Sequence, residues 1–273
     1  MKKVSEEVYK ALSAEGAAVQ KVRDLSIILL SDSRMLVIAC DSNASIGEKP
    51  ADYRRNTYEE VAVSALKVPF MEVLATGAEP LVVVDNLCVE MDGAGKRIIA
   101  NMRQELRRHG FGERVQLTGS TEDNMSTTQT ALGVTVIGML EAERSRIGKT
   151  RPGDLVVCIG VPRSGIQESY SEFQRDVANI GTVKRLVETA FVHELLPIGS
   201  KGAAYEAEQL CKTAGLRFQE EAAPRIDTRV SAGSSTAVLC SVCPEDYPAL
   251  EAAAGCPCCI IGKAQPERQG STK

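Results

Sequence analysis

The side chains best suited to chemistry are concentrated in one stretch, Thr118–Thr130, which is rich in hydroxyls and also holds Glu122, Asp123, Asn124 and Gln129. Carboxylate and hydroxyl oxygens bind hard cations, and such cations together with backbone N–H groups bind phosphate. Apolar runs flank the stretch and predict strands on both sides, so we expect a long functional loop here. The alternative is a solvated hairpin rich in Ser and Thr.

Three further acids accompany segments that must be largely buried. Asp41 follows the apolar run Met35–Cys40, Glu72 lies in a helix that is apolar almost all round, and Asp85 follows the apolar run Leu81–Val84. A buried charge is costly unless it is paired or meets a metal, and strand ends commonly line ligand sites. The pattern predicts one acidic cleft at the strand ends. Asp41 also fits a simple Asx-turn.

Two lysines lie in glycine-containing turns. Lys49 follows Gly47 shortly after Asp41, and Lys201 lies in Gly199–Gly202 at the start of an expected helix. N–H groups at a helix start bind anions, so the second turn fits a phosphate cradle or, alternatively, a plain helix entry.

Several catalytic classes lack their residues. The chain has only two histidines, His109 and His193, which leaves few candidates for a His-based metal site or a Ser-His-Asp triad. Gly148-Lys149-Thr150 resembles the end of a P-loop, but position 143 is Glu where that motif needs Gly. Cys240, Cys243, Cys256 and Cys259 have zinc-like spacing, yet a βαβ arrangement would place the pairs at opposite ends of a sheet, which favours buried or incidental thiols.

The elements that must position these residues alternate between strand and helix. Residues 4–20 predict a short helix or a mobile lead-in. We then expect strands at 25–30, 35–40, 81–84, 114–117, 131–140, 154–161, 234–242 and 257–264, and helices at 56–75, 96–109, within 172–192, through 211 and at 244–254. The helix at 56–75 opens with a capping box, Thr57 to Glu60.

Length and composition limit the function class. A chain of 273 residues is long enough for two domains, and a Pro-Gly boundary suggests 1–148, 149–264 and a disordered tail at 265–273. A net charge of -4 and scattered Lys and Arg argue against nucleic-acid binding. No apolar run is long enough for a membrane span, and nine cysteines in mainly apolar runs fit reduced thiols. We therefore expect a cytoplasmic protein.

Spaced motifs across nearly the whole chain resemble one superfamily. Met71–Leu81, Asp85-Asn86 and Thr118–Glu122 look like the motifs of the aminoimidazole-ribonucleotide (AIR) synthase-like, or PurM-like, ATP-binding superfamily. Ile38–Asp41, Ile46–Pro50, Thr118–Gln129 and Pro197–Gly202 look most like its α-ribazole kinases, a branch related to the selenophosphate synthetases.

The resemblance implies an α/β (α+β) architecture with two domains. The sheet of the N-terminal domain pairs with its twin in a homodimer, the C-terminal domain is of βαβ type, and ATP and Mg²⁺ bind between the domains. By position, Asp41, Glu72, Glu122 and Asp123 are the expected metal ligands, and Lys49, Lys201 and Asp85 the expected catalytic residues. Nucleotide contacts are expected from Gly47, Asn86, Thr118, Gly119, Ser120, Thr121 and Asn124.

The implied activity is an ATP- and Mg²⁺-dependent kinase that phosphorylates a nucleoside-like substrate, with α-ribazole in cobalamin salvage as the expected acceptor. Two alternatives stay open. The first is an ATP-dependent ligase or synthase of the AIR synthase or selenophosphate synthetase type, and the second is a non-catalytic nucleotide-binding protein.

Overall fold

The computed structural model describes residues 19–165 and 170–267 and divides into two compact units. The first holds the chain up to Val73 together with Gly77–Ser145, and the second holds Leu74–Thr76 and the chain from Arg146 onward. The helix or lead-in expected at residues 4–20 lies mostly outside the described residues, and its last two positions belong to a strand.

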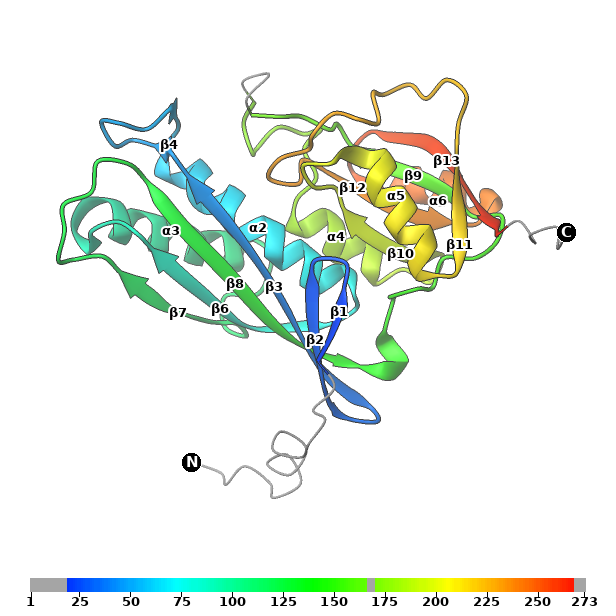
Figure 1. Ribbon diagram of the computed structural model, residues 1–273, viewed down its shortest axis with the longest axis horizontal. Coiled ribbons are helices and arrows are strands. Elements are labelled where there is room, and N and C mark those ends of the chain that lie inside the picture. The colour runs from blue at the N-terminus through cyan, green and yellow to red at the C-terminus, as the bar shows by residue number, and fades with distance from the viewer. Residues whose placement is uncertain (1–18, 166–169, 268–273) are drawn as a thin grey trace, which may run out of the picture. The chain divides into compact units, whose positions relative to one another are not determined.

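The first unit contains a six-stranded sheet among its described residues, in the order β1-β2-β3-β8-β6-β7 (Figure 1). The β6–β7 pair is parallel and the other neighbours are antiparallel. The strands are β1 (Val19–Val22), β2 (Leu25–Ser31), β3 (Arg34–Ala44), β6 (Glu79–Leu87), β7 (Gln116–Thr121) and β8 (Ala131–Glu141).

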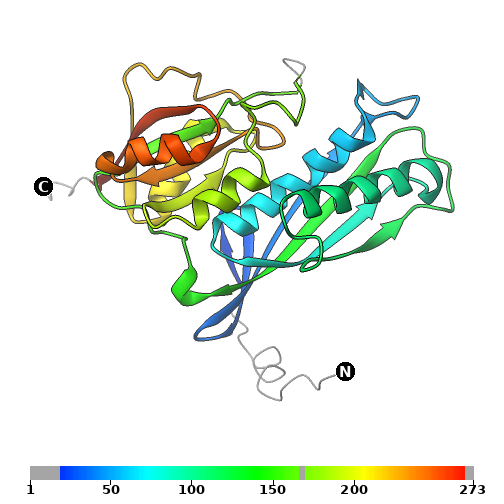
Figure 2. The same ribbon diagram turned by 180° about the vertical axis from the view of Figure 1, so that it is seen from behind.

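Two helices, α2 (Tyr58–Ala75) and α3 (Lys96–Arg108), cover one face of this sheet, as the two opposite views show (Figures 1 and 2). The Glu60 amide donates to Thr57 Oγ1 over 3.2 Å, which confirms the predicted helix start. Most of α2 is buried, and Phe70 packs edge to face on Phe111 beyond α3. The unit is therefore a sheet with one helix-covered face.

Three strands extend beyond the apolar runs that predicted them. β3 continues through Ala44 and β6 through Leu87, so Asp41 and Asp85 lie inside strands and do not follow them. β7 continues to Thr121, which shortens the expected loop to residues 122–130. Ladder hydrogen bonds are made by the backbone, so polar residues prolong a strand wherever a neighbouring strand continues.

The second unit contains a five-stranded sheet in its described part, in the order β10-β12-β9-β13-β11, with every neighbouring pair antiparallel. β12 and β13 run parallel to each other on either side of β9, so β12, the helix α6 (Tyr247–Ala254) and β13 form a split βαβ unit. The strands are β9 (Leu155–Gly160), β10 (Val192–Pro197), β11 (Leu216–Glu220), β12 (Ala237–Val242) and β13 (Cys258–Pro266).

Helices α4 (Ile180–Val187) and α6 (Tyr247–Ala254) contact each other, and Arg185 Nη2 donates to the Ala254 carbonyl over 3.0 Å. Helix α5 (Gly202–Thr213) packs its Ala203, Ala207 and Leu210 on the β9–β12–β13 face that carries Cys158 and Leu239. Every residue of β9 and β12 is buried, as expected for inner strands covered on both sides.

Several predicted elements need correction. Helix α4 occupies only part of the helix-rich tract expected at 172–192, because Asn179 caps it and turns precede it. β13 runs through Pro266, two residues into the expected tail, whose last residues lie outside the described chain. The short elements β4 (Ile46–Gly47), β5 (Arg54–Arg55), η1 (Met91–Gly95), η2 (Ala142–Arg144) and η3 (Pro244–Asp246) were not predicted as such.

The four zinc-spaced cysteines do not share one site. Cys243 follows the end of β12 and Cys256 precedes the start of β13, which are opposite ends of two parallel strands. In the described residues, no helix has both the length and the apolar character that a membrane crossing requires.

Candidate functional site

The sheet of the first unit places Asp41 and Asp85 on one rung. Asp41 in β3 and Asp85 in β6 both pair with Val134 of the intervening strand β8. Side chains directly opposite each other in antiparallel pairs point to the same face, and two such steps separate their Cα atoms by roughly 10 Å. Val134 is buried, so this is the helix-covered face. Two acids far apart in sequence therefore point into the layer between the sheet and the helices α2 and α3, which we call the acid-bearing layer.

Burial perturbs both carboxyl groups. Asp85 is 3% exposed, and its Oδ2 accepts no hydrogen bond. Burial raises the pKa of Asp85 to about 6. A hydrogen bond from its own backbone amide and the positive charge of Arg103 lower the pKa, but by less than burial raises it. Burial also raises the pKa of Asp41, opposed by a hydrogen bond from the Ser42 backbone. Removing these two charges from water is costly, and such perturbed acids are typical of functional sites.

Asn43 is a site residue that the sequence reading missed. It lies two residues beyond Asp41 in β3, so its side chain points to the same face of the sheet as Asp41. Asn43 Nδ2 donates to Ser64 Oγ over 3.1 Å, whereas Asn43 Oδ1 is buried and accepts no hydrogen bond. Side chains alternate between the two faces of a strand, so extending the predicted strand from Cys40 to Ala44 would have placed Asn43 on the same face as Asp41. Asn43 thus adds a neutral oxygen beside the two acids.

Glu72 is held by the packing of α2 on the same layer. Ser64 contacts Asn43 near the end of β3, and Val73 lies beside Gly138, which pairs with Val37 nearer its start. Helix α2 therefore runs antiparallel to β3, and Glu72 lies about 12 Å along the helix axis from Ser64. Glu72 is partly buried in the interior of the layer, away from the loop at residues 122–130.

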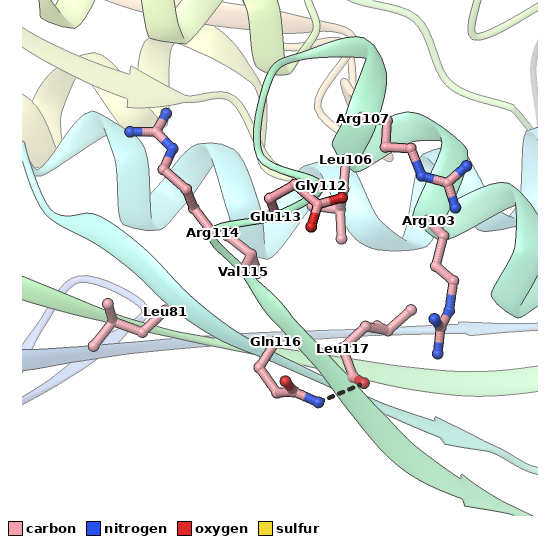
Figure 3. A pocket seen from close by; sticks show the side chains of 10 residues that line it. All are labelled: Leu81, Arg103, Leu106, Arg107, Gly112, Glu113, Arg114, Val115, Gln116 and Leu117. Atoms are coloured by element: carbon pink, nitrogen blue, oxygen red, sulfur yellow. Dashed lines mark hydrogen bonds between the residues drawn. The ribbon is translucent and has the colours of Figure 1, made fainter.

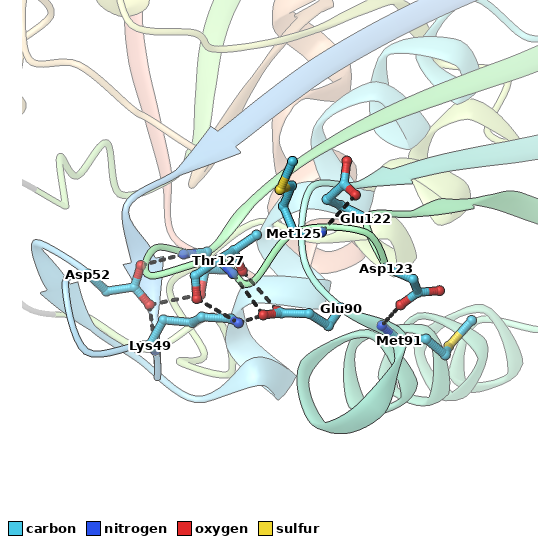
Figure 4. A network of polar contacts seen from close by, with 9 residues as sticks. Lys49, Asp52, Glu90, Met91, Glu122, Asp123, Met125 and Thr127 are labelled. Atoms are coloured by element: carbon cyan, nitrogen blue, oxygen red, sulfur yellow. Dashed lines mark hydrogen bonds and ion pairs between the residues drawn. The ribbon is translucent and has the colours of Figure 1, made fainter.

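Glu90 joins the loops at the end of this sheet (Figure 4). Its carboxylate forms an ion pair with Lys49 Nζ and accepts hydrogen bonds from Thr127 N at 2.7 Å and Thr127 Oγ1 at 2.8 Å. The bond from Lys49 is the main reason that the pKa of Glu90 falls to about 2. Lys49 Nζ also donates to the Thr127 carbonyl over 3.0 Å. The predicted catalytic Lys49 is therefore engaged by Glu90, which the sequence reading did not single out.

A second acid, Asp52, connects the same loops. It accepts hydrogen bonds from Lys49 N at 2.8 Å, Thr130 N at 2.7 Å and Thr130 Oγ1 at 2.8 Å. Gly47 fits tightly here, because an added Cβ would lie 2.4 Å from Thr130 Oγ1. Gly47 therefore serves a close approach between loops, whatever it contacts in a complex.

Glu122 and Asp123 take part in local hydrogen bonds (Figure 4). Glu122 Oε1 accepts from the Asn124 amide at 2.8 Å and the Met125 amide at 3.3 Å, and Asp123 accepts from Met91 N at 2.8 Å and Thr121 Oγ1 at 3.0 Å. In the described chain, the four expected metal ligands do not gather into a group of three carboxylates within 4.8 Å of one another. The expected metal set stays a prediction.

Residues 22–140 match the family model described as AIR synthase related protein, N-terminal domain. The match spans β2 to β8 and so contains the Asp41–Val134–Asp85 rung. The sheet of the first unit is thus similar to an AIR synthase-related N-terminal domain. No curated protein matches the sequence.

Solved structures match both units of the chain. Thiamine monophosphate kinase from Aquifex aeolicus is 18% identical over 91% of this chain and 90% of its own, with a TM-score of 0.60. A structure described as AaThiL complexed with AMPPCP and TMP is 19% identical over 91% and 87%, with a TM-score of 0.63. The hydrogenase maturation protein HypE in complex with ATP is 16% identical over 84% and 77%, with a TM-score of 0.57. These matches confirm the predicted two-sheet, PurM-like fold.

The other expected site residues lie on different surfaces. Asn86 is exposed and adjoins Asp85 in β6, so its side chain points to the opposite face of the sheet. Gly119 pairs with Asp85, and Thr118, Ser120 and Asn124 are exposed on β7 or in the loop after it. Lys201 belongs to the second unit, where Nζ donates to Tyr205 Oη over 3.2 Å.

A cavity of 420 Å³ lies between α3 and β7 of the first unit (Figure 3). Its lining includes Arg103, Arg107 and Arg114, but the three guanidinium groups point in different directions. Arg114 stacks on Phe111 and lies 3.6 Å from Glu79. Without convergent donors, this cavity is a weaker ligand site than the acid-bearing layer.

The acid-bearing layer fits a hard cation. Asp41 supplies a carboxylate and Asn43 supplies a buried oxygen that accepts no hydrogen bond, both from one face of β3. Mg²⁺ prefers such oxygens and usually keeps several of its own waters, so it needs few protein ligands. Asn43 and Asp41 therefore suit Mg²⁺ better than a transition metal.

Proposed function

We propose that the chain is an ATP- and Mg²⁺-dependent phosphotransferase that phosphorylates a hydroxyl of a nucleoside-like acceptor, with α-ribazole as the expected substrate. The observation that carries the proposal is Asp85, a buried acid with an unsatisfied oxygen and a raised pKa, on one rung with Asp41. The family match and the nucleotide complexes of similarly folded proteins support this class of chemistry.

The proposed roles follow from charge and burial. Asp41 and Asn43 would hold Mg²⁺ directly, and the ion would neutralise charge on the phosphate oxygens. Glu72 lies about 12 Å along α2 from Ser64, so it would contact the ion through the waters that Mg²⁺ keeps. Asp85 accepts the proton of the acceptor hydroxyl. A carboxylate with a pKa of about 6 is a better base near neutral pH than an ordinary one, and remains ionised there. Glu90 and Lys49 hold the loops that we expect to contact the phosphates.

Other residues also have roles in the proposed reaction. Gly47, Thr118–Thr121 and Asn124 line the phosphates, with Asn86 nearby. Lys201 neutralises the transferred phosphoryl group, which requires positive charge as it moves. Glu122 and Asp123 would need to exchange their local hydrogen bonds for the metal.

The direct test is product analysis. Purified protein is mixed with ATP and Mg²⁺ and, in separate reactions, with α-ribazole, thiamine monophosphate or a formamide-type substrate, and ADP and product are measured by mass spectrometry. One ADP per α-ribazole phosphate supports the full proposal. Turnover only with thiamine monophosphate supports kinase activity but shows that α-ribazole is not the acceptor. Turnover only with a formamide-type substrate favours the ligase alternative and refutes the kinase. ATP-induced thermal stabilisation without any turnover, unchanged by Asp41→Ala, favours a nucleotide-binding protein.

Residue roles are tested separately from substrate identity. Asp85→Asn is expected to lower kcat by about 10²- to 10⁴-fold with little change in KM, and to remove the rise of kcat with pH through about 6. Asp41→Asn is expected to raise the Mg²⁺ concentration needed for half-maximal rate. Asp32→Asn, in the exposed turn between β2 and β3, is the matched control and leaves both unchanged. A wild-type rate for Asp85→Asn contradicts its proposed role.

We also propose that the uncovered sheet face of the first unit pairs with a second copy. The described helices α2 and α3 both lie on the other face (Figures 1 and 2). The uncovered face carries partly buried apolar side chains, including Ile38, Val84 and Ile137, which a partner sheet would cover. Light scattering is expected to give twice the 29.3 kDa chain mass, and Ile137→Lys is expected to give the monomer.

A further inference from the structure

Asp154, His193 and Cys243 meet at one end of the second unit's sheet. Val192 of β10 pairs with Val242 of β12, which pairs with Leu155 of β9. Each of the three residues adjoins one member of this rung. Three separate strands therefore deliver a carboxylate, an imidazole and a thiol to the same place.

A bulge in β10 accounts for the direction of the imidazole. The register of β10 against β12 shifts between Val192 and Glu194, which leaves His193 as the extra residue. Bulges re-aim a side chain and are frequent beside functional sites. His193 Nδ1 lies 2.7 Å from Asp154 Oδ2, and Cys243 Sγ lies 4.0 Å from Asp154 Oδ1. Among the described residues, this is the one group of three possible metal ligands within 4.8 Å of one another.

The spacing suits a tetrahedral ion. Zinc bonds to oxygen and nitrogen are about 2.0–2.2 Å and to sulfur about 2.3 Å, so tetrahedral ligands lie roughly 3.3–3.6 Å apart. The separations of His193 Nδ1 and Cys243 Sγ from the nearer oxygen of Asp154, 2.7 and 4.0 Å, bracket that range. Small side-chain rotations would therefore admit the ion.

The carboxylate is held in place independently of the other two groups. Asp154 Oδ2 also accepts the Arg151 amide at 2.7 Å, and its backbone carbonyl accepts the Ala264 amide at 2.9 Å. Asp154 and His193 are 2% and 6% exposed, respectively, so water competes little for them. Anchored, nearly dry ligands are what a preorganised metal site requires.

The surrounding charge favours a cation over a nucleophilic thiol. The negative charges of Asp154, Glu245 and Asp246 act on Cys243, and only Arg151 opposes them. Reactive cysteines lie in positive surroundings that stabilise the thiolate, which is the reverse of this arrangement. The remaining alternative is a buried His193–Asp154 hydrogen bond with only a structural role. That alternative does not explain why the thiol of Cys243 lies beside the pair.

We propose that Asp154, His193 and Cys243 bind one Zn²⁺ ion, independently of the Mg²⁺ and ATP proposed for the first unit. Thiolate and imidazole select zinc over magnesium. Three protein ligands leave a fourth position for water or a substrate atom, the arrangement of catalytic and not of structural zinc.

The test uses the full chain and two metals. Zinc is measured by plasma mass spectrometry after overnight dialysis in dilute zinc and gel filtration, and the chelator-treated protein is then titrated with Co²⁺. Cobalt bound by a thiolate gives a sulfur-to-metal charge-transfer band, which cobalt on carboxylates does not give. Wild-type protein is expected to retain one zinc per chain and to develop the band up to one equivalent of Co²⁺.

Variants locate the site. Cys243→Ser is expected to remove the band and most of the zinc, and His193→Asn to weaken zinc binding at least tenfold. Cys258→Ser, a partly buried cysteine outside the group, is the matched control and keeps both signals. Circular dichroism checks that each variant is folded. Wild-type protein without zinc and without the band overturns the proposal, and so does a band that survives Cys243→Ser. If Cys243→Ser fails to fold, His193→Asn locates the site in its place, and an unchanged zinc affinity in that variant overturns the proposal.

Discussion

Asp85 and Gly119 are directly paired across the parallel strands β6 and β7, and a Cβ added to Gly119 would lie 1.8 Å from Asp85 Oδ1. The same Cβ would lie 1.9 Å from the Asp85 carbonyl oxygen, so rotation of the side chain alone does not relieve the overlap. The absence of a side chain at position 119 is what allows the buried carboxylate to stay on its rung with Asp41.

Gly119→Ala is expected to destabilise the first unit by about 1–3 kcal/mol, because the backbones of β6 and β7 must separate. Urea unfolding measures the change. Gly133→Ala is the control, since it adds the same methyl group on β8 where the nearest atom, Asp41 O, lies 3.8 Å away. Equal effects of the two substitutions would show that the contact with Asp85 is not the cause.

Asp85 is expected to make stability fall as pH rises. Its folded pKa of about 6 lies above the ordinary 3.8, so the folded state binds the proton more tightly than the unfolded state. Stability from this group is complete below about pH 4, declines between about 4 and 6, and is lower by about 3 kcal/mol above that range. Asp85→Asn removes this part of the pH dependence, so the wild-type and variant unfolding curves should converge at low pH. Parallel curves at every pH would contradict the raised pKa.

Glu90 is expected to hold the loop at residues 122–130 through Thr127. Glu90→Gln removes the charge that pairs with Lys49 and weakens the two hydrogen bonds from Thr127. Hydrogen exchange at the Thr127 amide should become at least tenfold faster. Asp92→Asn is the control. It likewise removes a carboxylate charge from an ion pair, the exposed pair with Lys96, and should leave exchange at the Thr127 amide unaffected.

Asp52 is expected to stabilise the fold by connecting two loops. It accepts three hydrogen bonds, from Lys49 N, Thr130 N and Thr130 Oγ1, and is 8% exposed. Asp52→Ala leaves these donors without their acceptor and should cost about 2–4 kcal/mol by urea unfolding. Asp32→Ala, at an exposed position, should cost less than about 0.5 kcal/mol. A comparable loss at both positions would indicate a nonspecific effect of removing charge.

The sequence by itself determined the order of the longer elements in the first unit, from β2 and β3 through α2, β6 and α3 to β7 and β8. The continuous apolar runs within β2 and β3, the capping residue Thr57 and the mostly apolar sequence of α2 are local signals, and each of them marks an element that the structure contains. It also indicated Asp41 and Asp85 as acids beside buried strands, because a charge next to an apolar run is visible without knowing the fold.

The tertiary structure alone decided which groups meet. β8 lies between β3 and β6, and only that pairing places Asp41 and Asp85 on one rung with Asn43 beside them. Likewise, Cys243 shares zinc-like spacing with other cysteines but lies beside Asp154 and His193, because strand order and a single bulge in β10 set its neighbours. Backbone hydrogen bonds between strands that are far apart in the sequence fix the strand register, and the spacing of residues along the chain does not reveal which strands will pair.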